Sequence, residues 1–369
     1  MKNKPIEALY IHIPFCAHLC DYCDFPKLQY FRNFASDYLI SLKRELDSYN
    51  IDRKQIKTIY VGGGTPTALE DDLFLKLLKV IKPYSENVLE YTFEANPESL
   101  SIEKLQMMKD YGVNRLSIGV ESTNDAILKA INRHHTYKDV QNAVSNARKM
   151  GFHNINLDLI IGLPNATKRQ LEKDLDNVLV LQPDHISCYS LTIHPNTVFF
   201  INKIEEPNGD FSRELYDLVE EKLTKNGFIH YEISNWCKEG KESFHNYTYW
   251  KDEQYYGAGL GASGYIDNRR YTNTKSIQKY IDGQYVDEEE MVDTKDDLTF
   301  FIMLNLRTKR GIIFDEFEER FKESFMDKYE EKVDKLVSQN LLILDKNRIY
   351  PTYSGMMVLD QIILELIRE

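Results

Sequence analysis

Residues 10–25 are YIHIPFCAHLCDYCDF, in which an apolar, β-rich run leads directly into closely spaced cysteines. The run predicts a strand over residues 8–14, so the cysteines are expected on a loop that follows the first strand. Cys16, Cys20 and Cys23 have the spacing C-x3-C-x2-C and account for three of the five cysteines in the chain. Such clustering is typical of metal or redox chemistry and not of structural disulfides.

The spacing predicts a [4Fe–4S] cluster with one open coordination position. Cysteine thiolates are the usual protein ligands of a four-iron cubane, so three cysteines leave one iron without a protein ligand. That iron can bind the amino and carboxylate groups of a methionine-derived ligand and place its sulfonium beside the cluster. The alternative is a zinc site completed by His12 or His18. Structural zinc usually draws its ligands from two paired knuckles, and no second knuckle occurs in the sequence.

The composition is that of a folded protein with a full core. The chain has 369 residues, 42% of them hydrophobic, and a net charge of −12. This length suits one large domain plus a smaller one, and the acidic charge argues against sequence-independent nucleic-acid binding. We find no signal-peptide core and no apolar run near the roughly 20 residues that cross a bilayer, so a cytoplasmic protein is expected. Cys188 and Cys237 stand alone and are interpreted as buried small hydrophobes.

The first half of the chain alternates short β-rich runs with longer amphipathic ones. Strands are expected over 8–14, 57–61, 88–94, 115–120, 154–161 and 185–193, and helices over 33–49, 69–81, 101–111, 137–150 and 167–181. Ser101 and Thr167 are expected to cap helices, and Gly112 and Gly151 to end them. This alternation predicts an α/β fold with a parallel sheet, either a doubly wound sheet or, as we prefer, a partial (β/α)6 barrel.

Polar and glycine-rich motifs follow successive expected strands. They are the cysteine loop, the stretch GGGTPT at 62–67, Glu94 and Asn96, Glu121, and Asp158 with the stretch GLP at 162–164. Ligands of parallel β/α folds bind at the carboxyl ends of the strands, so these motifs are expected to meet at one rim. There Gly63 and Gly64 allow close backbone approach, and Thr65 offers a hydroxyl. Glu94 and Asp158 can accept hydrogen bonds from amino or ribose groups, and Arg133 can pair with a carboxylate.

The pattern changes after residue 195. Residues 1–195 are expected to form the barrel, 196–295 an extension with an aromatic-rich segment and a glycine-rich loop at 257–265, and 296–369 a small C-terminal helical domain with a short hairpin. That ending is similar to a winged helix. Because the chain is acidic, a packing or partner-docking role is favoured over DNA binding.

These motifs identify the chain as a member of the radical S-adenosylmethionine superfamily, over essentially its whole length. The string at 10–25 resembles the branch that contains oxygen-independent coproporphyrinogen III dehydrogenases and haem chaperones. The resemblance implies that the GGG loop contacts the methionine amino group and that Tyr10 and Tyr22 line the same ligand. Two positions depart from the family pattern: Glu121 stands where the motif has glutamine, and His194 stands where relatives usually have glutamate.

Within that branch, three features favour a haem carrier over the decarboxylating enzyme. The dehydrogenase motif continues to a fourth cysteine where this chain has Phe25, and only fifteen residues precede Cys16, whereas the dehydrogenase has a longer extension. The third feature is HNYTYW at 245–250, which matches an H-N-x-x-Y-W motif of the haem-chaperone branch. A radical enzyme acting on another substrate is the remaining alternative.

The resemblance implies a haem site at this motif, with His245, Tyr249 and Trp250 as candidate residues. Imidazole and phenolate are known axial haem ligands, and aromatic rings can pack on a porphyrin face. The alternative is a structural histidine in an aromatic cluster. The partners implied are haem, an electron donor for the cluster and a haem-acceptor protein, for which a membrane-associated respiratory haem protein is a candidate.

Overall fold

The centre of the fold is a run of six parallel strands within one twelve-stranded sheet. The computed structural model describes residues 5–368. The six strands are β1 (Ala8–Ile13), β4 (Thr58–Gly63), β5 (Glu90–Ala95), β6 (Arg115–Glu121), β7 (Ile155–Ile161) and β8 (His185–Ser190). They lie in the sheet in chain order, as expected for repeated right-handed β–α crossovers. The sheet has free edges and does not close on itself, so the expected partial (β/α)6 barrel is confirmed.

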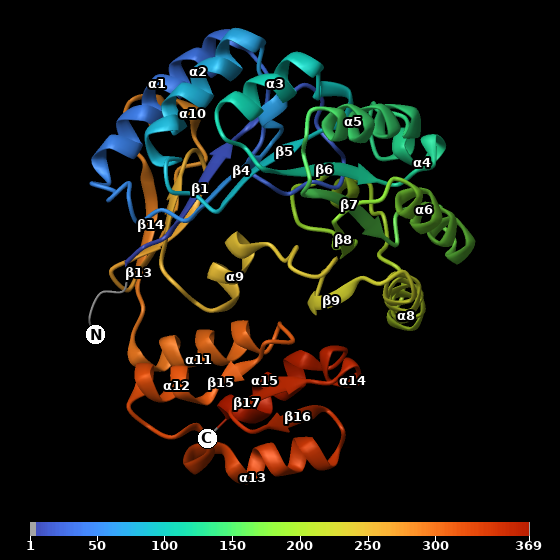
Figure 1. Ribbon diagram of the computed structural model, residues 1–369, viewed down its shortest axis with the longest axis vertical. Helices are drawn as coiled ribbons and strands as arrows, with labels where there is room; N and C mark the ends of the chain where they lie inside the picture. The colour runs from blue at the N-terminus through green and yellow to red at the C-terminus, as the bar shows by residue number, and fades with distance from the viewer. Residues whose placement is uncertain (1–4, 369) are drawn as a thin grey trace.

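Helices cover the outer face of these strands (Figure 1). They are α1 (Arg32–Ser48), α2 (Asp71–Ile81), α3 (Ile102–Asp110), α4 (Asp125–Ala130), α5 (Tyr137–Lys149) and α6 (Lys168–Val180). The predicted caps are confirmed, because the hydroxyls of Ser101 and Thr167 accept hydrogen bonds from the first turns of α3 and α6. Gly112 and Gly151 follow α3 and α5 with φ of +91° and +78°, which a glycine adopts without strain.

Shorter strands extend the sheet at both edges. On one side β11 (Tyr255–Ala258) is parallel to β1, followed by antiparallel β12 (Ser263–Ile266), β13 (Arg269–Asn273) and β14 (Val286–Met291). On the other side β10 (Asn235–Cys237) and β9 (Ile229–Glu232) are antiparallel to β8. The glycine-rich stretch 257–265 thus includes the end of β11 and most of β12, and the loop within it is limited to residues 259–262. A Cβ at Gly257 would lie 1.8 Å from the Ser263 carbonyl oxygen, so the glycine there allows two strands to approach closely.

One long helix, α8 (Gly209–Lys225), and three short ones lie in the connections to these edge strands. The short ones are α7 (Val198–Ile201), α9 (Phe244–Trp250) and α10 (Ile277–Ile281). In Figure 1, α9 lies between the sheet and the C-terminal elements. The aromatic-rich segment of the sequence thus lies in the interior, facing the strands.

The C-terminal region has its own small sheet and hydrophobic core. Its elements are α11 (Thr294–Asn305), β15 (Ile312–Ile313), α12 (Phe314–Phe321), α13 (Phe325–Ser338), β16 (Leu342–Asp345), β17 (Arg348–Pro351), α14 (Tyr353–Met356) and α15 (Leu359–Ile367). The strand order β15–β17–β16 and the hairpin after the helices give the expected winged-helix-like arrangement. Phe301, Phe317 and Phe325 belong to a core cluster separate from that of the barrel. Within residues 5–368, no helix is long and apolar enough to traverse a lipid bilayer.

A buried ion-pair network joins α9 to the C-terminal region. Asp252 directly follows α9 and is 4% exposed. Its carboxylate accepts hydrogen bonds from Arg270 at 2.5 Å and Arg320 at 2.6 Å, and Arg320 also pairs with Asp297 of α11. Because these charges are withdrawn from water and depend on one another, the C-terminal end of α9 is held in place.

Candidate functional site

The cysteine loop is fixed at both ends. Short strands β2 (Phe15–Cys16) and β3 (Leu28–Gln29) pair across it, and the buried ring of His12 bonds through Nε2 to the Pro26 carbonyl at 2.7 Å. Burial lowers the pKa of His12 to about 4, so the ring is neutral near pH 7. The loop therefore has a defined position over the carboxyl end of β1.

The three thiols lie close enough to influence one another. Burial raises the pKa of Cys16 to about 11, and it also raises the pKa of Cys23. The Thr65 hydroxyl lies 3.7 Å from Cys16 Sγ, and Lys27 donates to the Cys23 carbonyl. Without iron the Cys16 and Cys23 thiols hold their protons, and metal binding must release them.

The glycine loop after β4 is packed too tightly for any side chain. A Cβ at Gly63 would lie 2.5 Å from the His12 ring, and one at Gly64 would lie 2.8 Å from the Pro14 backbone. Gly63 also has φ +109°, a region that favours glycine. These glycines bring the backbone of their loop against the end of β1, next to the cysteine loop. The expected approach of this backbone to a ligand stays a prediction.

Glu94 lies directly behind this loop. Its carboxylate accepts hydrogen bonds from the Tyr60 hydroxyl at 2.8 Å and from the Gly63 amide at 2.9 Å. Its pKa is raised to about 7, mainly by burial and in smaller part by the nearby carboxylates of Asp158 and Glu121. A ligand ammonium group beside Glu94 would favour the ionised carboxylate, so this position suits a cationic amino group.

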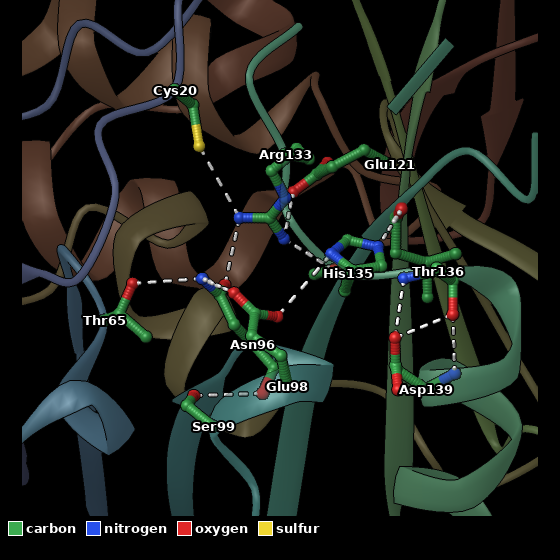
Figure 2. Close-up of polar contacts among 12 residues, drawn as sticks. Cys20, Thr65, Asn96, Glu98, Ser99, Glu121, Arg133, His135, Thr136 and Asp139 are labelled. Carbon is green, nitrogen blue, oxygen red and sulfur yellow. Dashed lines mark hydrogen bonds and ion pairs between the residues drawn. The ribbon is translucent and has the colours of Figure 1, made fainter. Parts of the chain in front are cut away.

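Arg133 links several predicted site residues (Figure 2). One guanidinium nitrogen lies 3.6 Å from Cys20 Sγ and donates to the Asn96 side chain at 3.0 Å. The other terminal nitrogen donates to the Gly119 carbonyl at 2.6 Å and lies 3.3 Å from Glu121. The Nε atom is buried without a partner among the described residues. Arg133 thus places a positive charge beside the cysteine loop with one donor still to be satisfied.

Glu121 is both buried and conformationally unusual. It ends β6 at a register shift with φ +60°, a left-handed conformation that is uncommon outside glycine. Burial raises its pKa, while Arg133 lowers it. Tyr22, from inside the cysteine loop, lies near both groups and packs against Phe199 with 6.4 Å between ring centroids. Backbone strain of this kind is concentrated at functional sites.

Asp158 and Tyr10 occupy the interior of the barrel below this rim. Asp158 accepts hydrogen bonds from Ser117 at 2.9 Å and Asn156 at 2.8 Å, and burial raises its pKa. The Tyr10 hydroxyl bonds to His12 Nδ1 at 2.9 Å, and its ring tilts against Tyr60. The structure therefore groups the cysteine loop with Thr65, Arg133, Glu121 and Tyr22, and it places the remaining candidates in the adjoining interior.

These residues fit an iron–sulfur cluster with an amino-acid ligand. The fit rests on the glycine cradle against the cysteine loop and on the unpaired Nε of Arg133. Among residues 5–368, no three or more His, Cys, Asp or Glu side chains are placed to hold one metal ion together. Each thiolate of a cubane binds a different iron, so convergence on a single point is not required.

The sequence did not single out Ser117, Asn156, His185 or Tyr60, four polar residues that lie in line with the predicted ones. Strand register places Glu94, Ser117, Asn156 and His185 opposite one another across β5 to β8. In the same way Tyr60 stands opposite Tyr10. These residues could have been found from the two-residue alternation of side chains along a strand. Once one residue of a strand is known to point inward, the alternation assigns the others to the concave face.

His245 lies inside the protein and is 1% exposed. Its Nδ1 bonds to the Thr58 hydroxyl at 2.9 Å and its Nε2 to the Tyr249 hydroxyl at 2.8 Å. Burial lowers its pKa to about 3. Glu90 of β5 accepts three hydrogen bonds from residues 243–245 at the start of α9. The ring thus has neither a free nitrogen nor access to solvent in this conformation, while the buried Trp250 Nε1 has no partner among the described residues.

Comparison with protein families matches two parts of the chain. Residues 10–178 match the Radical SAM superfamily, and residues 292–358 match the HemN C-terminal domain. Among solved structures, coproporphyrinogen III oxidase (HemN) from Escherichia coli superposes with a TM-score of 0.84 at 22% identity, covering 99% of this chain and 90% of that chain. At this identity the similarity shows the fold.

Curated relatives match nearly the full length. The chain is 39% identical over 364 residues to "Heme chaperone HemW" of Lactococcus lactis subsp. lactis (strain IL1403), covering 96% of this chain and 95% of the relative. It is 38% identical over 366 residues to the protein of that name from Bacillus subtilis (strain 168), covering 95% and 96%. The Escherichia coli (strain K12) protein of that name is 33% identical over 318 residues, covering 83% and 84%.

Proposed function

The chain belongs to the HemW family of radical S-adenosylmethionine proteins, and from this premise we propose that it is a haem chaperone, which binds haem and transfers it to an acceptor protein. The observation that carries the proposal is the similarity over nearly the whole chain to proteins named haem chaperones. The proposal includes an acceptor protein, an electron donor for the cluster and a cytoplasmic setting, in which thiols stay reduced.

Family membership implies a [4Fe–4S] cluster and S-adenosylmethionine, and we propose specific residues for both. Cys16, Cys20 and Cys23 are the cluster ligands. The S-adenosylmethionine contacts are Tyr10, Tyr22, Gly63, Gly64, Thr65, Glu94, Glu121, Arg133 and Asp158. In this arrangement Glu94 faces the amino group and Arg133 the carboxylate. When bound, the cluster and its ligand supply one-electron chemistry at the barrel rim. Residues 1–195, 196–295 and 296–369 are the proposed structural units.

The alternative function is oxygen-independent coproporphyrinogen III dehydrogenation. The HemN-like fold is compatible with it. Phe25 separates the two, because it stands at the position of the fourth cysteine of the dehydrogenase motif and its side chain is 58% exposed. Radical chemistry on another substrate remains a further alternative, since the cluster motif is intact.

One preparation can test both functions. After anaerobic reconstitution with iron and sulfide, we expect the protein to bind hemin at one equivalent or more and to form no product from coproporphyrinogen III. Hemin binding is followed by absorbance, and porphyrinogen products by chromatography after oxidation. Formation of protoporphyrinogen with consumption of S-adenosylmethionine would contradict the chaperone function and establish the enzyme.

We propose His245, Tyr249 and Trp250 as an internal haem position that requires α9 to move. Because Nε2 of His245 is bonded to Tyr249 and α9 is held at both ends, iron binding there is expected as a slow phase after mixing with hemin. His245→Ala should remove this slow phase. Tyr249→Phe removes the competing hydroxyl and should accelerate it. Stopped-flow absorbance measures both, and identical slow phases in all three proteins would show that His245 is a structural residue.

A further inference from the structure

An exposed imidazole stands at the mouth of the barrel, on the side opposite to α9. His194 follows β8, and its Nε2 lies 3.5 Å from Oδ2 of Asp24 in the cysteine loop. The two side chains are 47% and 41% exposed. His245, in contrast, bonds to Thr58 at the first residue of β4, which is the amino end of the parallel strands. The two histidines therefore lie at opposite ends of the barrel.

The pairing with Asp24 suits a metal-binding histidine. Such histidines usually give one ring nitrogen to a carboxylate, which orients the ring and raises the basicity of the other nitrogen. Within residues 5–368, the contact with Asp24 is the one side-chain interaction of the His194 ring, so Nδ1 is free. His194 thus has one ring nitrogen next to a carboxylate, while its second nitrogen has no partner among the described residues.

An apolar surface adjoins this pair. We call it the mouth patch, and it consists of Phe25, Val198, Phe200 and Ile201, whose side chains are 58%, 42%, 53% and 68% exposed. The Phe199 amide donates to the Asp21 carbonyl at 3.1 Å, which holds α7 against the cysteine loop, the segment that also carries Phe25. Large apolar side chains clustered at such exposure indicate a binding surface.

One kind of ligand matches all of these groups. A haem has an iron that accepts imidazole, a flat apolar macrocycle and anionic propionates. The exposed Lys203 closes α7 and provides a cation next to the patch. A transferable cargo must also be reachable by an acceptor, and a ligand on the rim meets that condition without movement of the fold.

We infer that His194, supported by Asp24, is an axial ligand for haem iron at the barrel mouth, with the mouth patch against the porphyrin and Lys203 beside a propionate. This inference rests on the proposed haem-chaperone function. It adds a haem site at the barrel mouth to the internal position proposed at His245. It also gives a role to a residue in which the chain departs from the glutamate usual in its relatives.

Hemin titration of the cluster-reconstituted protein tests the ligand. Binding is measured from the absorbance change that occurs immediately on mixing. His194→Ala should weaken this hemin binding by about 10- to 100-fold and should shift the Soret band. Imidazole added to His194→Gly should restore the wild-type band. The matched control is His153→Ala, which removes another exposed histidine, between α5 and β7, and should bind hemin as the wild type does.

Binding of metal-free protoporphyrin IX distinguishes coordination of the iron by His194 from packing of the porphyrin on the mouth patch. His194→Ala should leave its binding unchanged, whereas the double variant Phe200→Ser/Ile201→Ser should weaken binding of both porphyrins. If the wild type binds hemin and His194→Ala has the same affinity and Soret band, the His194 assignment is wrong and haem carriage stands. If the wild type binds no hemin, both proposals fail.

Discussion

Replacing Cys16, Cys20 or Cys23 by alanine is expected to abolish the iron–sulfur cluster completely. Each substitution removes the only protein ligand of one iron and leaves a second coordination position open. Burial keeps the Cys16 and Cys23 thiols protonated in the absence of iron, so two remaining cysteines must still release their protons to bind the metal. Two thiolates are not expected to bind iron tightly enough to offset the free energy that this deprotonation requires.

The measurement is iron and sulfide content together with visible absorbance after anaerobic reconstitution. Wild type should approach about four irons per chain and each variant about none. Cys237→Ala is the matched control, because Cys237 is buried in β10 and far along the chain from the loop. Full iron content in Cys16→Ala, Cys20→Ala or Cys23→Ala would overturn the ligand assignment.

The parallel half of the fold was predictable because each element carries its own pattern. The six central strands, β1 and β4 to β8, are mostly buried and appear as short β-rich runs, with amphipathic helices between them. Helix caps such as Ser101 and Thr167 are local signals as well. The sequence thus indicated both the order of the elements and the rim at which their carboxyl ends meet.

The edge strands were not predictable in the same way. β14 has the sequence VDEEEM and all six side chains are exposed, so it lacks any apolar alternation. It is a strand because β13 pairs with it. Its acidic side chains are typical of an edge that must not pair with another chain. Pairing of this kind is decided by tertiary structure and not by local sequence.

For the candidate site, the sequence identified residue types but not their contacts. Arg133 was expected to meet a ligand carboxylate, which stays a prediction, whereas its contacts with Asn96, Gly119 and Glu121 were not foreseen. His245 was identified from a motif. The same motif places Tyr249 one helical turn away, where its hydroxyl is hydrogen-bonded to Nε2 of the His245 ring. Burial and hydrogen-bond occupancy of this kind depend on how distant segments pack.

Arg133→Met is expected to destabilise the protein strongly and to weaken S-adenosylmethionine binding. Methionine fills a similar volume but leaves the buried Glu121 carboxylate without its cation, and breaking a buried ion pair in this way costs about 3–5 kcal/mol. Burial already raises the pKa of Glu121, so removal of Arg133 raises it further and favours the protonated form. Denaturant unfolding of the cluster-free protein measures the loss of stability.

Glu121→Gln distinguishes two roles of Arg133, neutralisation of Glu121 in the fold and binding of S-adenosylmethionine. Glutamine keeps a hydrogen-bond acceptor and removes the buried charge. Alone it should change the free energy of unfolding by less than about 1 kcal/mol. Combined with Arg133→Met it should recover most of the lost stability, with a coupling energy of about 1–3 kcal/mol, because no unpaired carboxylate remains. S-adenosylmethionine affinity, measured on the reconstituted protein, should stay low in the double variant, since Glu121→Gln does not restore the positive charge that Arg133 places beside Cys20. Recovery of affinity together with stability would mean that Arg133 only neutralises Glu121, whereas equal stability of Arg133→Met and wild type would mean that the pair contributes nothing to the fold.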